Sequence, residues 1–345
     1  MKSRILLFAA LAAVVLAGAA LAGKPGSGGS TGTASVFVSN PVQSLGDESL
    51  TDQKDAASAV PATAYANVPL RNLDGSGNLV GKWANVRSAT GTPAYSPTNT
   101  FSYTRNDDRF EQVMAYFWVN QAQEYLQSLG FGRTLRPVNM ESQDVRIDQY
   151  GVDNSFSWDK HDYLRFGKGG VDDAEDAEVI LHEYGHAVQD AQVPGYGATA
   201  EGGAMGEGFG DFQAGAYFAR TSGGFQDTCL MAWDSTSYAE GPQTCIRRMD
   251  STKRYPKDIE DEVHADGEIW STFLWQVRAG LPGNAVQKSD SALRLVITMH
   301  EFLTPKAKFG DAVASLRTAA KALKHPEWTR VINAAATKRG LPLEP

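Results

Sequence analysis

The sequence has little of several features that define common classes of protein. Its 345 residues include only six histidines and only two cysteines, which can form at most one disulfide within the chain. Acidic residues outnumber basic ones, and the formal net charge of −8 argues against binding to nucleic acid or to an anionic membrane. Neither a repeat period nor a second long apolar run follows the N-terminus. With 42% apolar residues, the chain can bury one large hydrophobic core or two small ones.

The N-terminus has the pattern of a signal peptide. Lys2 and Arg4 precede an apolar run over residues 5–22 that ends in Ala-Leu-Ala. We therefore predict a signal peptide over residues 1–22 and an exported protein, secreted or periplasmic, with no membrane segment once the signal is removed. An uncleaved membrane anchor is the alternative, but the many small residues favour cleavage. The stretch over residues 23–33, rich in glycine and serine, is predicted to be a flexible leader.

The two cysteines, Cys229 and Cys245, are separated by a short segment rich in turn-forming residues. In an exported protein, such a pair most simply forms one disulfide bond. Two free thiols are the alternative. In neither case do we expect the sulfur atoms to bind a metal.

The most informative motif is the pentapeptide His182-Glu183-Tyr184-Gly185-His186. Two histidines four residues apart lie on one face of a helix, so both imidazoles can bind one zinc ion. Glu183 projects beside that face, where its carboxylate can meet a metal-bound water without being a ligand itself. The alternative is a pair of ordinary surface or core histidines.

A zinc ion that does chemistry needs a third protein ligand and an open fourth position. The metzincin pattern is excluded, because Gln189 and Gln192 stand where it needs glycine and histidine. The following segment instead offers Glu207 and Asp211, which share a helix face, so that one can bind the metal while the other accepts the free N–H of a ligand histidine. Glu201 is a competing ligand, but it precedes a Gly-Gly pair that suggests a helix start. A solvated acidic face is the alternative for the pair.

These motifs resemble those of a known family. H-E-Y-G-H followed by G-E-G-F-G-D is similar to the pattern of the thermolysin-type gluzincins, and more closely to that of the fungalysin-like metallopeptidases, H-E-Y-x-H and then G-E-G-x-x-D. The resemblance implies that His182, His186 and Glu207 are the zinc ligands. It also implies that Glu183 is the general base and that Asp211 supports His182.

Two further matches flank the motif. Residues 263–270, V-H-A-D-G-E-I-W, resemble the fungalysin segment whose histidine donates a hydrogen bond to the oxyanion, which implies this role for His264. A surface histidine between acidic neighbours is the alternative. Residues 153–156 resemble the edge strand that holds the substrate peptide as an added strand, which makes Asn154 a candidate for substrate binding. Ordinary turn chemistry is the alternative for Asn154.

The sequence also departs from the family at two helix positions. Gly185 and Gly210 stand where helix-favouring or hydroxyl residues are often found. Each glycine is expected to cost about 1 kcal/mol relative to alanine in a helix interior. We expect both to weaken the local helices without touching a proposed ligand.

The rest of the pattern predicts an α+β fold, and the family resemblance implies that it is the fold of a thermolysin-like zincin. Residues 34–345 are predicted to form one metallopeptidase catalytic domain, β-rich over 34–170 and helical over 171–345, with the active-site cleft between the halves. Asp173 is the expected N-cap of the helix that carries the pentapeptide. Helices are predicted near residues 107–129, 269–277, 292–302, 309–323 and 328–338, and strands near 145–147, 156–158 and 163–166.

The combined pattern predicts an exported, monomeric zinc endopeptidase that cleaves polypeptides with a zinc-activated water and Glu183 as general base. The alternatives are an exopeptidase on the same site, for which no motif that binds a free terminus is present, and a catalytically silent, zinc-stabilised binding protein. Neither Glu183 nor His264 is needed to hold the metal, which argues against the silent protein. Related enzymes mostly favour an apolar residue after the cleaved bond. One catalytic Zn²⁺ is expected. For the acidic residues 172–176 the two interpretations are a Ca²⁺ site and a solvated helix start, and the absence of EF-hand spacing favours the helix start.

Overall fold

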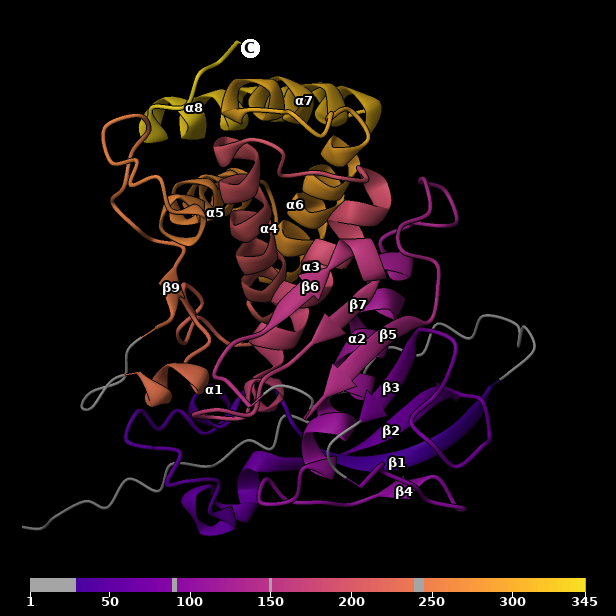
Figure 1. Ribbon diagram of the computed structural model, residues 1–345. Coiled ribbons are helices and arrows are strands. Elements are labelled where there is room, and N and C mark those ends of the chain that lie inside the picture. The colour runs from indigo at the N-terminus through magenta and orange to yellow at the C-terminus, as the bar shows by residue number, and fades with distance from the viewer. Residues whose placement is uncertain (1–28, 89–91, 149–150, 239–244, 345) are drawn as a thin grey trace, which may run out of the picture.

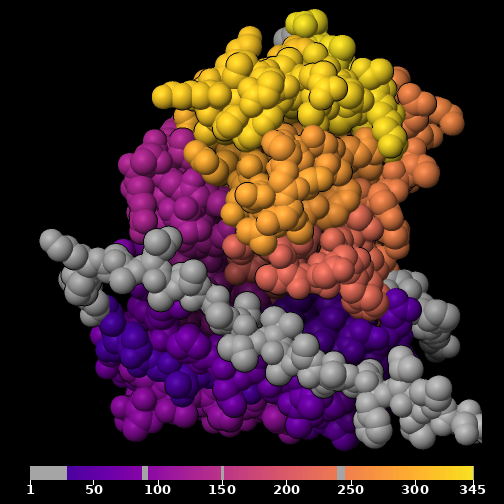
Figure 2. Space-filling view, turned by 180° about the vertical axis from the view of Figure 1, so that it is seen from behind, coloured from indigo at the N-terminus to yellow at the C-terminus, as the bar shows by residue number. Residues whose placement is uncertain are grey.

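The computed structural model describes residues 29–88, 92–148, 151–238 and 245–344. The predicted signal peptide therefore lies outside the described residues, as does most of the predicted leader. Strands β1 to β4, within residues 30–101, lie at one end of the molecule and the C-terminal helices α7 and α8, within residues 309–339, at the other, which agrees with the predicted α+β architecture with a helical C-terminal half (Figure 1). Seen from behind, the N-terminal and C-terminal parts again occupy opposite ends (Figure 2). In the ranges given above, no helix has the length and apolar character that a membrane span requires.

Two sheets lie in the N-terminal half. The smaller has the strand order β2-β1-β4 and the larger the order β3-β5-β7-β6. In the larger sheet the pairs are parallel, except that the edge strand β6 runs antiparallel to β7. A separate antiparallel pair, β8 and β9, follows in the C-terminal half. The strands are β1 (Ser30–Phe37), β2 (Tyr65–Leu73), β3 (Ala84–Ser88), β4 (Thr100–Phe101), β5 (Gln143–Ile147), β6 (Phe156–Trp158), β7 (Tyr163–Arg165), β8 (Cys229–Leu230) and β9 (Arg247–Arg248).

The first strand begins earlier than the sequence predicts. Residues 30–33, predicted to belong to the flexible leader, are part of β1. Strand β1 pairs with β2 along its length and with β4 at Thr33 and Ala34, so the backbone of these residues is held by neighbouring strands. Because their side chains are mostly exposed, the stretch lacks the apolar alternation by which a strand is recognised. The prediction of a leader is wrong for these residues.

The helices overlap those predicted. Helix α5 begins six residues before its predicted start, because the Glu262 side chain accepts hydrogen bonds from the backbone N–H groups of His264 and Ala265 and so caps it. The helices are α1 (Pro41–Leu45), α2 (Arg109–Ser128), α3 (Ala177–Gln192), α4 (Ala200–Phe218), α5 (Val263–Gly280), α6 (Ala285–His300), α7 (Phe309–Ala322) and α8 (Thr329–Arg339).

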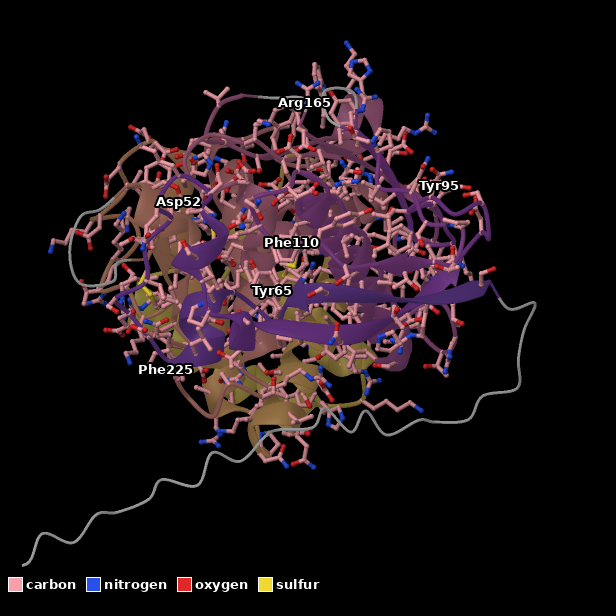
Figure 3. The ribbon with its side chains drawn as sticks, turned by 90° about the horizontal axis from the view of Figure 1, so that it is seen from below. Asp52, Tyr65, Tyr95, Phe110, Arg165 and Phe225 are labelled. Atoms are coloured by element: carbon pink, nitrogen blue, oxygen red, sulfur yellow. A yellow bond between two sulfur atoms is a disulfide. The ribbon has the colours of Figure 1, made fainter. Side chains whose placement is uncertain are left out.

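Helix α2 is the core helix of the N-terminal half and is buried on almost every face. The rings of Phe37 in β1, Tyr65 in β2 and Phe110 in α2 pack together, with ring centroids 4.7 to 5.4 Å apart. Figure 3 shows Tyr65 and Phe110 close together. The indole N–H of Trp118 donates to the carbonyl oxygen of Phe37 at 3.1 Å. Helix α2 also contacts α3, so it ties the small sheet to the helix that carries the pentapeptide.

The N-cap of α3 is Asp176, and not Asp173 as the sequence predicts. The Asp176 backbone is extended, and its side chain accepts a hydrogen bond from the backbone N–H of Glu178 at 2.9 Å. Asp173 instead opens a short 3-10 turn that ends at Glu175, before the helix begins. An aspartate three residues before the true N-cap is difficult to distinguish from it by sequence, because aspartate favours both turns and caps.

Helix α4 packs between α3 and α5 at short range, and its glycines make this possible. A Cβ atom at Gly208 would lie 2.5 Å from the carbonyl oxygen of Gly267 in α5. On the other side, a Cβ atom at Gly210 would lie 2.7 Å from Nδ1 of His182 in α3. Both distances are shorter than van der Waals contact, so only glycine allows this helix spacing.

The sequence-based interpretation of Gly185 and Gly210 therefore needs correction. We expected both glycines to leave the proposed ligands untouched, but Gly210 provides the space that the His182 ring occupies. A Cβ atom at Gly185 would in turn lie 3.1 Å from Cα of Gly210. Glycine lowers the helix propensity at these two positions, but it allows α3 and α4 to cross at short distance.

We predict that Gly208→Ala lowers the free energy of unfolding by about 1 to 3 kcal/mol, because the added methyl group would meet backbone that cannot move independently. Gly206→Ala is the matched control in the same helix. Its Cβ atom would lie 3.3 Å from a side-chain oxygen of Gln189, which can move aside, and alanine favours the helix. Denaturant unfolding should therefore show a smaller loss for Gly206→Ala. Equal losses would contradict the packing account.

Candidate metal centre

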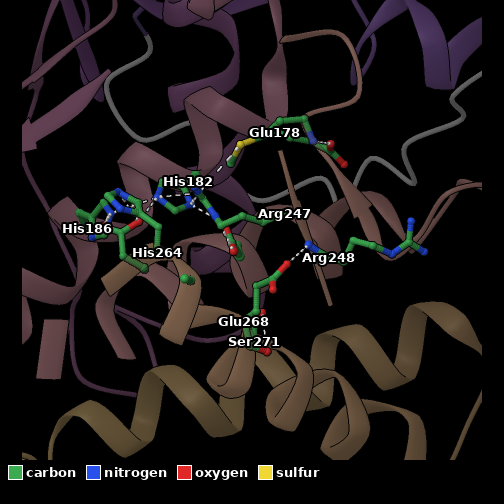
Figure 4. A network of polar contacts seen from close by, with 12 residues as sticks. Glu178, His182, His186, Arg247, Arg248, His264, Glu268 and Ser271 are labelled. Atoms are coloured by element: carbon green, nitrogen blue, oxygen red, sulfur yellow. Dashed lines mark hydrogen bonds and ion pairs between the residues drawn. The ribbon is translucent and has the colours of Figure 1, made fainter. Parts of the chain in front are cut away.

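The candidate centre lies in a cavity of about 780 Å³ bounded by α3, α4, the start of α5, β6 and β9. Its walls thus come from the edge of the larger sheet and from the helical half, where the cleft is predicted. Figure 4 shows the side chains that meet at its inner wall.

Three predicted ligands converge at this wall. The Nε2 atoms of His182 and His186 lie 3.1 Å apart. Glu207 brings Oε2 to 3.2 Å from Nε2 of His182 and Oε1 to 3.5 Å from Nε2 of His186. One donor atom of each residue lies within 4.8 Å of the others. Two imidazoles and one carboxylate are a donor set that suits zinc.

Glu207 shows the convergence most clearly. Its Oε2 atom is buried, and within the described residues it has no hydrogen-bond partner, although it lies close to His182. A buried carboxylate oxygen without a donor is costly, and a cation removes the cost. The geometry is therefore that of ligands aimed at a common point, more than that of a hydrogen-bonded cluster.

Asp211 fixes the orientation of His182. One turn along α4 from Glu207, it places Oδ1 2.9 Å from Nδ1 of His182. With Nδ1–H donating to this carboxylate, Nε2 of His182 is left free to bind a metal. Asp211 is fully buried, so its charge acts on the imidazole without screening by water.

The electrostatics of the two histidines differ. Burial lowers the pKa of His186 to about 4. For His182, burial and the charge of Arg247 lower the pKa, but the hydrogen bond to Asp211 and the adjacent carboxylate of Glu207 outweigh them and raise it to about 9. An imidazole binds a metal only in its neutral form, so a bound cation would replace the proton that His182 otherwise holds.

Glu183 lies in the same cavity and is not one of the converging donors. Burial raises the pKa of its carboxyl group to about 7, although the charge of His182 lowers it. A carboxyl group with a pKa near neutrality can both accept and release a proton at that pH.

Arg247 in β9 is a site residue that the sequence analysis missed. Its Nε and Nη2 atoms donate to the two carboxylate oxygens of Asp211, each at 2.8 Å, and Nη2 lies 3.2 Å from Nδ1 of His182. The guanidinium thus neutralises the buried carboxylate. Figure 4 shows Arg247 directed to His182 and the next residue, Arg248, directed away. No local pattern marks Arg247, because a long loop brings it to the site.

The Cys229–Cys245 disulfide that the sequence predicts is present. It joins the start of β8 to the residues just before β9. Because Cys245 lies two residues before Arg247, the bond helps to hold the arginine beside α4. The proximity of a predicted disulfide is the one sequence signal that could have pointed to Arg247.

His264 reaches the centre from the first turn of α5. Its Nε2 atom lies 3.5 Å from Oε2 of Glu207, and its Nδ1 atom lies 2.6 Å from Oε1 of Glu262. The side chain is about half exposed, at the rim of the cavity. Glu262, a second residue that the sequence analysis missed, caps the helix and orients the imidazole at the same time.

Asn154 lines the cavity just before the edge strand β6. Its side chain is exposed. Ser155, Phe156 and Ser157 continue the same wall, so one edge of the larger sheet faces the cavity.

Two other predicted candidates are not part of the group of converging ligands. Glu201, the competing ligand, accepts a hydrogen bond from the backbone N–H of Phe309 at 2.8 Å and is not part of the converging group. The acidic run 172–176 does not point to one place, since Glu175 binds Arg105 and Asp176 caps α3.

We predict that Arg247→Met lowers the free energy of unfolding of the metal-free protein by roughly 3 kcal/mol, because it leaves the buried charge of Asp211 without its cation. Arg248→Met is the matched control on the same strand. Arg248 is 51% exposed and pairs with the exposed Asp250, so its loss should cost less than about 1 kcal/mol. Denaturant unfolding of both variants measures the difference, and similar losses would contradict the role given to Arg247.

The part of the chain that carries this centre matches known proteins. Residues 148–295 match the family model described as fungalysin metallopeptidase (M36). An extracellular metalloproteinase of Aspergillus niger is 30% identical over 119 residues, which cover 31% of this chain and 18% of the relative. A probable extracellular metalloproteinase 2 of Arthroderma benhamiae is 27% identical over 194 residues, which cover 48% of this chain and 30% of the relative. The matches thus span less than a third of either relative.

The fold has a solved counterpart. The precursor of protealysin, a metalloproteinase from Serratia proteamaculans, superposes with a TM-score of 0.57 and covers 74% of this chain and 86% of that chain. At 16% sequence identity, this similarity concerns the fold alone. Over residues 148–295, which hold most of the candidate centre, the chain is therefore similar to the fungalysin metallopeptidases, and its fold is similar to that of the protealysin precursor.

Proposed function

We propose that the protein is an exported zinc endopeptidase. The observation that supports this most strongly is the convergence of His182, His186 and Glu207 within 4.8 Å, with Glu183 beside them in one cavity. The donor set fits zinc, and the unpartnered Oε2 atom of Glu207 fits a bound cation. Export is supported by the predicted signal peptide and by the extracellular metalloproteinases among the relatives.

The chemistry divides between the metal and the chain. When bound, zinc acts as a Lewis acid that polarises the scissile carbonyl group and makes water more acidic. Glu183 accepts a proton from the attacking water and passes it to the leaving amine. His264 donates a hydrogen bond to the carbonyl oxygen as negative charge develops on it. Asp211 and Arg247 hold His182 in the tautomer that binds metal.

The edge strand β6 suggests how the substrate is held. Its outer side faces the cavity, while its inner side pairs with β7. An extended peptide can add to such an edge through backbone hydrogen bonds, which suits a peptidase that cuts within a chain. Asn154, at the start of this edge, is the side chain that we propose contacts the substrate backbone.

A direct test is the hydrolysis of casein by the purified protein. Activity should disappear when a chelator removes zinc and should return with about one equivalent of Zn²⁺ per chain. A protein that binds zinc but cuts neither casein nor any peptide of a broad library would instead be a silent, zinc-stabilised binding protein. Release of single terminal residues alone would identify an exopeptidase.

Glu183→Gln should retain about one zinc ion per chain and lose nearly all peptidase activity, because glutamine keeps the shape of the side chain but cannot accept the proton. Metal analysis and casein hydrolysis measured on the same sample test this. If zinc and activity are lost together, Glu183 holds the metal or the fold, and the proposed division of roles fails.

Glu207→Gln and Asp211→Asn should differ in their effect on the metal. Loss of a ligand should remove zinc from Glu207→Gln under conditions in which the wild type is loaded. Loss of a supporting acceptor should weaken zinc affinity in Asp211→Asn by roughly 10- to 100-fold, with activity recovered when zinc is added. Zinc titrations of both variants decide the order, and the reverse order would exchange the two roles.

His264→Ala should lower kcat by roughly 10²- to 10³-fold while zinc content stays unchanged, because the hydrogen bond strengthens mainly in the transition state. The KM for a peptide substrate should change little. Steady-state kinetics together with metal analysis test this prediction. Near-normal turnover in His264→Ala would show that another residue stabilises the carbonyl oxygen.

A further inference from the structure

A second group of acidic side chains lies in the wall of the same cavity. Asp153, Asp173 and Asp234 each place one carboxylate oxygen within 4.8 Å of the others. They come from three separate segments: the residues before β6, the turn before α3, and the turn after β8. Asp173 and Asp234 line the cavity that also holds Glu183 and the candidate zinc ligands. We call these three residues the acidic pocket.

The acidic pocket has unused acceptor atoms. Asp173 and Asp234 are only 2% and 7% exposed, and the Oδ1 atom of each is buried without a hydrogen-bond partner in the part of the chain that the structure describes. The donors at these carboxylates are neutral: the hydroxyl group of Ser155 and a backbone group of Gly167 at Asp173, and the hydroxyl group of Tyr238 at Asp153. Within the same ranges, no lysine or arginine forms an ion pair with any of the three carboxylates. Buried carboxylates with free oxygens favour a cationic ligand.

The acidic pocket lies close to the groups that we propose act on the scissile bond. The pKa of Asp173 is raised to about 8, mainly by burial and further by the charges of Asp153 and Glu183. Burial and the neighbouring carboxylates raise the pKa of Asp234 well above its usual value, whereas the charge of Arg247 acts in the opposite direction. Arg247 itself cannot fill the pocket, because its guanidinium is bound to both oxygens of Asp211.

From this arrangement we infer that the acidic pocket binds the cationic side chain of a lysine or arginine next to the scissile bond. The inference rests on the proposed peptidase function and specifies its substrate class: polypeptides cleaved beside basic residues. An ammonium or guanidinium group within the cavity would donate to the carboxylates of Asp173 and Asp234, which line it. The preference would differ from the apolar one that the family resemblance implies.

The wider charge of the cavity agrees with a basic substrate. Asp159 and Asp190 also line it, and these two carboxylates lie close enough for their charges to interact. Asp234 lies at the N-terminal end of α3, where its backbone N–H donates to Asp176, whereas Asp190 lies near the C-terminal end. Fourteen residues of helix separate Asp176 from Asp190, which is about 21 Å at 1.5 Å per residue. The two ends of the cavity can therefore be tested separately.

The test uses the mature, zinc-loaded protein and two series of peptides that vary the residue just before or just after the cleaved bond. Each series contains lysine, norleucine or glutamate at that position, because norleucine resembles lysine in shape without the charge. In one series, kcat/KM for lysine should exceed that for norleucine at least tenfold. In Asp234→Asn this ratio should fall by roughly 10- to 100-fold, as expected for loss of a charge-assisted hydrogen bond. Asp173→Asn, which can keep the bond from Ser155, should act likewise if Asp234→Asn does not fold.

Asp190→Asn is the matched control, since it removes one charge from the far end of the same cavity. If it lowers the lysine preference as much as Asp234→Asn does, the preference reflects the overall field and the inference is wrong. Equal cleavage of lysine and norleucine peptides in both series would also overturn it. The inference would also be wrong if the acidic pocket bound Ca²⁺, as shown by Ca²⁺ binding to the wild type but not to Asp234→Asn, and the wild type showed no preference for lysine with or without Ca²⁺.

Binding can be measured without turnover. In the zinc-loaded Glu183→Gln variant, calorimetry should show at least tenfold tighter binding of the lysine peptide than of the norleucine peptide. Tight binding of the lysine peptide without cleavage by the wild type would contradict the proposed function and leave the acidic pocket as a recognition site. Cleavage of norleucine peptides without a lysine preference would contradict only the acidic pocket.

Discussion

The close packing of α4 against α3 and α5 is the constraint on which the candidate centre depends. The centre takes both histidines from α3, Glu207 and Asp211 from α4, and His264 from α5. Side chains this short can meet only if the helices nearly touch. The missing Cβ atoms of Gly208 and Gly210 allow that contact, and the His182 ring fills the space beside Gly210. These glycines lower the helix propensity of α4, but they allow the close packing that brings the donor atoms together.

Buried charge is the second constraint. Asp211 is fully buried, and its charge is shared between the imidazole of His182 and the guanidinium of Arg247. Strand β9, held to β8 by the disulfide, brings that guanidinium to a helix from which it is distant in sequence. The acidic pocket lacks such a partner among the described residues. Asp211 and the acidic pocket therefore differ. Cationic groups of the protein neutralise the charge of Asp211, whereas the proposed ligand would neutralise that of the acidic pocket.

The sequence predicts those parts of the fold and site that depend on local spacing. The positions of His182, His186, Glu207 and Asp211 follow from helix periodicity and from the motif, and the structure brings these four together. Arg247 and the acidic pocket could not be predicted, because loops bring them to the cavity and no short pattern marks them. The strand at residues 30–33 was missed because its partners, and not its own side chains, stabilise it. The role of Gly210 is visible only once the neighbouring helix is in place.

The central claim is that one metal ion is held jointly by α3 and α4. The most direct test is a crystal structure of the zinc-loaded protein, with anomalous diffraction recorded on both sides of the zinc absorption edge. The account predicts one strong zinc peak at roughly 2.0 to 2.2 Å from Nε2 of His182, Nε2 of His186 and a carboxylate oxygen of Glu207. A zinc peak that lacks any of these three donors, or one that lies among the carboxylates of the acidic pocket, would contradict it.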